Sequence, residues 1–445
     1  MNNTTQSDIA TLSERVSAAL ATARDLGASQ AEASASRGAG LSATVRMREV
    51  ETLEYHRDQG LAVTVFFEHR KGSASTSDLD PDAVAEAVQK ACSLAQYAAE
   101  DEFAGLAAAE RMARDIPDLD LYHPWDLEPA AAIELATECE AAGLAADARI
   151  TNSEGATLST HSGARVYGNT HGFLAGYPSS QHSLSCAVLA SENGAMERDF
   201  DYSVSRSPEL LESAGAIGRE AAVRAVRRLG ARKLDTATVP VLYPARLARS
   251  LFGHFVGAIS GGNLYRKSTF LADALNQTVF ADRVNVAEQS HIPGGLASAP
   301  FDAEGVATAD RPLIDAGVLR GYVLGSYYAR KLGLETTGNA GGIHNLVVDS
   351  TGESYDDLLA GMDRGLLLTE LMGQGVNTVT GDYSRGAAGF WVEHGELCYP
   401  VNEITVAGNL ADMYKQIEAV GTDVDLRGGI RTGSVLVGGM TIAGN

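Results

Sequence analysis

The spacing of hydrophobic residues predicts an N-terminal helix followed by strands and a second helix. In residues 7–26, hydrophobic side chains recur at steps of three and four, and Gly27 then supplies a common helix stop. Residues 41–56 carry two valines among charged residues, and 61–67 is a β-branched and aromatic run suited to a buried strand. An Asp-Pro pair starts the next helical segment, 80–99. This order is typical of an α+β unit.

The middle of the chain is predicted to contain a linker, two helices and a long β region. Residues 99–126 are polar and indicate a linker, and an alanine-rich helix with an aspartate at its N-cap is predicted in 126–146. Thr, Ser, Val and Tyr alternate with Gly in 148–206, which indicates strands. A Ser-Pro pair opens a further helix in 207–230, whose C-terminal arginines suit the negative pole of the helix dipole.

Glycine content separates the last part of the chain from the rest. Of the 47 glycines, 31 lie after residue 250, which indicates many turns and close backbone approaches. Short hydrophobic runs predict a strand at 239–243 and further strands in this part at 317–324, 346–349, 390–392, 404–407 and 434–440. The sequence therefore predicts an α+β fold with an N-terminal α/β domain (1–100), a middle α/β region (101–230) and a β-rich, Gly-rich C-terminal domain (231–445).

Charge and cysteine content exclude several classes of function. The 445 residues include 57 acidic and 35 basic ones, and a net charge of −22 argues against nucleic-acid binding. No apolar run approaches the roughly 18 residues of a membrane span, and the first 16 residues lack a secretory leader, so we expect a cytosolic protein. The four cysteines are scattered, which predicts reduced thiols and neither a disulfide framework nor a cysteine-rich zinc site.

One predicted helix raises the question of a metal. Pro244 can start it, and a histidine, His254, then falls on its apolar stripe with Leu247, Leu251, Phe255, Ala258 and Ile259. A helix that holds zinc needs at least two donors, commonly with a neighbouring glutamate. This helix has one histidine and no carboxylate, so a hydrogen-bonded core or interface histidine is favoured over a ligand.

A second candidate is the pair of carboxylates Asp302 and Glu304, which precede Gly305. On an extended backbone both side chains would lie on one face, where they could bind a polar substrate edge or act as a general acid and base. Because carboxylates are mostly exposed, the spacing alone favours a solvated strand end.

Several longer blocks resemble the TldD/PmbA family of metalloproteases. The blocks are 301–305, 313–322, 327–333, 337–342, 381–393 and 404–410, and the last two resemble the PmbA branch, also called TldE. The resemblance covers essentially the whole chain. It implies a cytosolic bacterial protease in which a TldD subunit pairs with a PmbA subunit, and an association with maturation of a gyrase-poisoning peptide, degradation of antitoxins and modulation of DNA gyrase.

The resemblance also implies where a metal would be bound in TldD chains and that it is lost here. In the TldD branch a helix carries HExxxH, which supplies two zinc ligands and the catalytic glutamate. The alignment places that motif on 253–258, so the ligand positions become Gly253 and Ala258 and the glutamate becomes His254. The third ligand, a cysteine in a later Gly-rich loop, has no counterpart in 385–389.

We therefore interpret the sequence as a non-metallated PmbA-like subunit with no catalytic residue and no cofactor of its own. Zinc and activity are expected in a TldD-type partner, and the substrate is expected to be an unfolded peptide that adds to a strand edge, for which Asp302, Glu304 and Gly305 are the candidates. Alternatives are an autonomous hydrolase with a different metal site built on His254, and a non-enzymatic protein that binds gyrase or another partner. A homodimer of the chain alone stays open.

Overall fold

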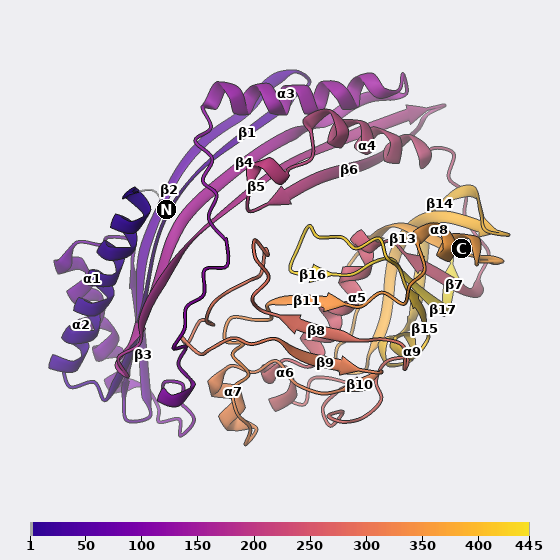
Figure 1. Ribbon diagram of the computed structural model, residues 1–445. Coiled ribbons are helices and arrows are strands. Elements are labelled where there is room, and N and C mark those ends of the chain that lie inside the picture. The colour runs from indigo at the N-terminus through magenta and orange to yellow at the C-terminus, as the bar shows by residue number, and fades with distance from the viewer. Residues whose placement is uncertain (1–2, 445) are drawn as a thin grey trace.

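A six-stranded antiparallel sheet forms the N-terminal half of the protein, seen here in a computed structural model that describes residues 3–444. Its strand order is β3-β2-β1-β4-β5-β6. The strands are β1 (Gln30–Arg46), β2 (Glu49–Phe67), β3 (Arg70–Thr76), β4 (Ile150–Asn169), β5 (Leu174–Glu192) and β6 (Ala195–Ser205). The sheet curves over the rest of the molecule, and we call it the arch (Figure 1). Because β1 pairs with β4, the predicted N-terminal and middle regions contribute to one sheet.

Two pairs of helices cover the convex face of the arch (Figure 1). They are α1 (Asn3–Asp25) with α2 (Pro81–Tyr97), and α3 (Pro129–Ala146) with α4 (Ala214–Arg227). Both pairs of helices cover the same face of the sheet, as Ala33 and Leu41 of β1 show. Their positions differ by an even number of residues, so their side chains point to the same face of the strand. Ala33 is buried under the first pair and Leu41 under the second.

Two sequence expectations in this half are wrong in detail. The predicted strand 41–56 is a hairpin, because Met47 and Arg48 form its turn with positive φ angles of 50° and 67°. Both backbone N–H groups donate to the buried carboxylate of Glu140 on α3 at 2.7 Å, which holds this conformation without glycine. The helix predicted from Ser207 is a short 3₁₀ turn, Pro208–Leu210, and α4 starts only after Ser213, whose hydroxyl caps it.

The C-terminal half contains two further sheets on the concave side of the arch (Figure 1). One has the order β10-β9-β8-β11-β16, and the other has the order β14-β13-β12-β7-β17-β15 with an added β14–β17 pairing that closes five of its strands into a barrel. The strands are β7 (Ala237–Tyr243), β8 (Val286–Gln289), β9 (Arg311–Asp315), β10 (Val318–Leu319), β11 (Asn345–Val348), β12 (Arg364–Met372), β13 (Asp382–Glu393), β14 (Glu396–Asn409), β15 (Ile417–Val420), β16 (Ile430–Arg431) and β17 (Val435–Ala443). The strand expected at 317–324 is reduced to β10.

Helix α5 (Ala245–Ala258) packs inside this half, where its buried residues share one core with both sheets. The shorter elements are the 3₁₀ turn Ala109–Arg111, α6 (Gly261–Tyr265), α7 (Ser326–Lys331), α8 (Tyr355–Ala360) and α9 (Leu410–Lys415). Among the helices of residues 3–444, none combines the length and the apolar character that a membrane crossing needs.

Candidate functional site

The backbone of α5 separates the two positions at which the resemblance places metal ligands. Gly253 is exposed, whereas Ala258 is fully buried. Five residues along a helix correspond to a rotation of about 140° between side chains. Neither residue carries a donor atom, and side chains placed at the two positions would point in different directions.

His254 lies between these positions, half-buried, with its ring edge-to-face against Tyr383 at a centroid distance of 6.1 Å. Its Nε2 atom is buried and has no hydrogen-bond partner among the described residues. The hydrogen bond expected at this atom is therefore missing. Burial, and secondly the positive charge of Arg385, lower the pKa of His254, so the imidazole is neutral near pH 7.

Asp302, Glu304 and Gly305 lie in a tight turn, so the expected strand with both carboxylates on one face is wrong. Phe301 bridges Ala307, and the chain reverses between them. Asp302 is 2% exposed, and its carboxylate accepts hydrogen bonds from three backbone N–H groups, those of Glu304, Val306 and Ala340 at 2.9 Å. Glu304 accepts one from the N–H of Ser326 at the start of α7. Both carboxylates hold backbone segments together.

This turn packs against the arch. Gly305 has a φ of +77°, and a Cβ atom there would come within 2.8 Å of Tyr167 and 2.9 Å of Phe173. Phe301 contacts Phe173 edge-to-face, with ring centroids 5.2 Å apart. Burial raises the pKa of Asp302 to about 6, and the nearby Glu304 adds to this, against the three N–H donors.

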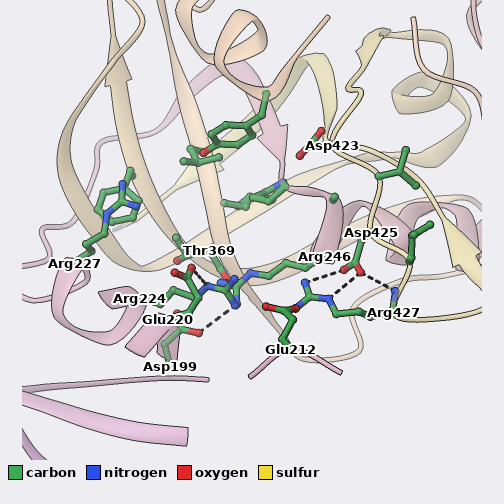
Figure 2. A pocket seen from close by; sticks show the side chains of 18 residues that line it. Asp199, Glu212, Glu220, Arg224, Arg227, Arg246, Thr369, Asp423, Asp425 and Arg427 are labelled. Atoms are coloured by element: carbon green, nitrogen blue, oxygen red, sulfur yellow. Dashed lines mark hydrogen bonds and ion pairs between the residues drawn. The ribbon is translucent and has the colours of Figure 1, made fainter. Parts of the chain in front are cut away.

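A cavity of about 570 Å³ lies at the other end of the interface, between α4 and β6 of the arch and the C-terminal half. Figure 2 shows arginines and carboxylates converging on it: Arg224, Arg246, Arg427, Asp199, Glu220 and Asp425. Asp201 binds Arg224 at 2.8 Å and Arg427 at 3.1 Å. Both pairs are largely buried, and the Asp201–Arg427 pair makes an ionic contact between the halves.

The same network continues behind the cavity wall. Arg228 is 7% exposed and contacts Glu197, Asp199 and Glu370 at 3.3, 3.5 and 2.6 Å. Asp199 also contacts Arg246 of α5 at 3.3 Å. The arch is thereby tied to the N-terminal part of α5.

Comparison with known proteins decides the family. Three family models match the chain: the PmbA/TldA metallopeptidase domain 1 at residues 31–95, the central domain at 122–229 and the C-terminal domain at 236–444. The chain belongs to the PmbA/TldD metallopeptidase family.

Relatives within the PmbA/TldD family place the chain nearer to PmbA than to TldD proteins. It is 51% identical to Metalloprotease PmbA of Escherichia coli O157:H7, over 93% of this chain and 92% of that protein. The PmbA homolog of Haemophilus influenzae is 47% identical over 98% of this chain and 96% of its own length. The TldD homolog of the same organism is 25% identical over 67% of this chain and 66% of its length.

The fold agrees with solved PmbA/TldD-type structures. A protein from Bacteroides thetaiotaomicron, described as a candidate modulator of DNA gyrase, superposes with a TM-score of 0.92 over 97% of this chain and 98% of that chain, at 28% identity. The α+β prediction is confirmed.

The PmbA/TldD family description implies a metal, and the residues of this chain do not fit one. Within residues 3–444 no three His, Cys, Asp or Glu side chains converge in a metal-binding arrangement. The segment expected as a later Gly-rich loop, 385–389, lies inside strand β13. Cys398 is exposed on β14, and all four cysteines are free. No step of a reaction can be derived through a metal held by this chain.

Sequence reasoning missed the ionic contact. It assigned Arg224 and Arg228 to the helix dipole, although they bind acidic residues of β6. A signal was present, since Asp199 and Asp201 alternate with aromatic residues in a strand pattern, which puts both carboxylates on one face.

Proposed function

We propose that this chain is the non-metallated subunit of a cytosolic TldD/PmbA-type protease that acts on unfolded peptides. A TldD-type partner would supply zinc and the catalytic glutamate, and this chain would supply part of the substrate enclosure. One observation carries the proposal: α5 is kept as a packed helix, while Gly253 and Ala258 have no donor atoms.

The packing of α5 supports a structural role. Leu251 and Phe255 are almost completely buried in the core shared by both C-terminal sheets. Loss of such side chains costs a few kcal/mol, about 2–5, so the helix is needed for the fold even without metal chemistry. The presence of a PmbA and a TldD homolog in Haemophilus influenzae supports a pair of subunits.

We assign a structural role to Asp302, Glu304 and Gly305 in place of the expected peptide-binding role. The hydrogen bonds of Asp302 and Glu304 hold the turn in shape, and the aromatic residues around Gly305 support the enclosure by holding the arch against this turn. The three residues do not offer a free strand edge to a peptide.

Metal analysis and reconstitution test the proposal together. The purified chain should contain well under one zinc per molecule and should hydrolyse no peptide alone. Mixed with a TldD-type chain that carries HExxxH, it should form a complex on size exclusion, and hydrolysis should require both chains and the partner's glutamate. A partner that is fully active alone at the same concentration would refute the role of obligatory subunit.

The unpartnered Nε2 atom of His254 favours one second candidate, an autonomous hydrolase with a different metal site. His254→Gln separates the two functions. Under our proposal, the variant keeps partner-dependent hydrolysis within a few-fold, whereas loss of a zinc ligand or general base costs about a hundredfold or more in kcat. Zinc near one per chain, lost together with activity on chelation, would establish the second candidate.

A further inference from the structure

The cavity at the ionic contact contains one arginine that the contact does not use. Four arginines line this cavity of about 570 Å³. Three of them bind carboxylates, namely Arg224, Arg246 and Arg427. The fourth, Arg227 of α4, is exposed and has neither an ion pair nor a side-chain hydrogen bond within residues 3–444; its guanidinium lies over the ring of Phe390 at 5.2 Å. This cation is free to bind a ligand.

The carboxylates of the cavity divide in the same way. Three of them bind arginines, namely Asp199, Glu220 and Asp425. Glu212 and Asp423 have no cationic partner in the described part of the chain. Asp423, in the loop between β15 and β16, accepts hydrogen bonds only from the N–H and the hydroxyl of Ser434, at 2.9 and 2.6 Å. Its negative charge is therefore not neutralised by the fold.

Arg227 and Asp423 lie on opposite sides of the cavity (Figure 2). Tyr355 is also part of the lining, and it senses both charges. Burial raises the pKa of its hydroxyl, Arg227 lowers that pKa and Asp423 raises it. The other lining side chains include an apolar set, made up of Leu367, Leu368, Phe390, Val424 and Leu426. The cavity thus has an apolar wall with unpaired charges of opposite sign on its two sides.

We propose that this cavity binds a short peptide with free termini. The C-terminal carboxylate of the peptide pairs with Arg227, its N-terminal ammonium pairs with Asp423, and its apolar side chains pack against the leucines and Phe390. The inference goes beyond the proposed function, because the cavity lies within this chain and needs neither a TldD-type partner nor zinc.

Charge and size favour this class of ligand. The lining carries four arginines and five carboxylates, so an anion such as phosphate would meet a net negative surface, and a simple cation would leave Arg227 unpaired. A peptide of two to four residues is about 7–14 Å long when extended, which is the scale of a cavity of this volume. Ligand pockets of this size commonly lie between domains, as this one does between the arch and the C-terminal half.

Calorimetric titration of the purified full-length chain tests the inference. The tripeptide alanyl-leucyl-alanine should bind with a dissociation constant on the order of 100 μM. Amidation of its C-terminus and acetylation of its N-terminus should each weaken binding about tenfold, because each change removes one charge-assisted pair. These comparisons use the parent chain, so they do not depend on how a variant folds.

Two variants assign the two ends of the peptide. In Arg227→Gln the amidated peptide should bind as well as the free acid, whereas acetylation should still weaken binding. Asp423→Asn should show the reverse pattern. Arg232→Gln is the matched control for the first variant, because Arg232 is another exposed arginine over an aromatic ring, at 4.8 Å, and lies outside the lining. Asp382→Asn is the control for the second, since Asp382 is also exposed and accepts a hydrogen bond from a hydroxyl at 2.6 Å.

Three results would overturn the proposal. They are no detectable binding at millimolar peptide, equal binding of the free, amidated and acetylated peptides, and a control variant that removes a terminal preference as completely as Arg227→Gln or Asp423→Asn. Binding that appears only after addition of a TldD-type chain would assign the peptide to that partner and would overturn it as well. Zinc content and hydrolysis are not measured in this titration, so its failure would leave the proposed function standing.

Discussion

Two contacts of opposite character help to fasten the arch to the C-terminal half. At β6 and α4 the contact is ionic, with Asp199 and Asp201 each shared between two arginines. At the turn around Gly305 it is aromatic and closely packed, and its carboxyl group, Asp302, faces backbone N–H groups without an arginine.

The difference shows how one interface can combine specific pairing of opposite charges with tight apolar packing. Buried ion pairs add little net stability over apolar pairs, but loss of one partner leaves an uncompensated charge. Aromatic packing tolerates salt, yet it leaves no space for an added atom. Substitutions, pH and salt should therefore affect the two contacts differently.

The largest effect is expected at the ionic contact. Arg228→Met leaves Glu197, Asp199 and Glu370 without their shared cation and should lower the free energy of unfolding by about 3–5 kcal/mol in urea titrations. Arg198→Met is the control, because its pair with Glu154 is 45% exposed on both sides and should cost less than about 1 kcal/mol. Equal losses in the two variants would contradict the distinction.

The next effect is expected at the aromatic contact. Gly305→Ala places a methyl group against Tyr167 and Phe173 and should cost roughly 2–3 kcal/mol, part from the positive φ and part from the clash. Gly172→Ala provides the control, since Gly172 also has a positive φ, +94°, but open space around it. If both variants lose the same stability, close packing at Gly305 is not what limits this position.

The pH dependence of stability should sharpen the comparison. The folded-state pKa of Asp302 is raised to about 6 from 3.8, so its stabilising contribution is complete below pH 4 and is lost as pH rises through 6. The stability of the parent relative to Asp302→Asn should therefore increase by roughly 1–2 kcal/mol between pH 7.5 and pH 5. A difference that stays constant across this range would show that Asp302 does not titrate there.

Salt should produce the smallest effect. Arg224 is partly exposed, and in 1 M NaCl the loss caused by Arg224→Met should shrink by about 0.5 kcal/mol, because its pair with Glu220 is screened. The loss caused by Gly305→Ala should stay the same. Thermal melts at 0.1 and 1 M NaCl compare the two variants directly.

Local patterns predicted the elements whose shape depends on their own residues. Strand β7 and helix α5 were expected from Val239 and Pro244 onward, because an apolar run and then an apolar stripe specify them. The turn at Met47 was missed because it contains neither Gly nor Asn. Its conformation depends on Glu140, 93 residues away in sequence.

In the candidate sites, too, local patterns missed the features that depend on residues far apart in the sequence. The missing donors at Gly253 and Ala258 could be predicted from residue identity alone. The turn at Asp302 could not, because its carboxylate is held partly by Ala340 N–H, 38 residues later. The ionic contact joins Asp201 to Arg427 across 226 residues, a separation that no local pattern encodes.

The pairing of β1 with β4 determines when the central strands of the arch can form during translation. Glu32 lies opposite Asn169, so after β1 and β2 have left the ribosome, β1 waits for about 100 more residues before its second neighbour is complete. At 5–20 residues per second this delay lasts roughly 5–20 seconds. During that time the nascent hairpin presents an unpaired inner edge and an uncovered apolar face to the cell. Helices α1, α2 and α3 all precede β4 in the chain, so they can cover this face as they emerge.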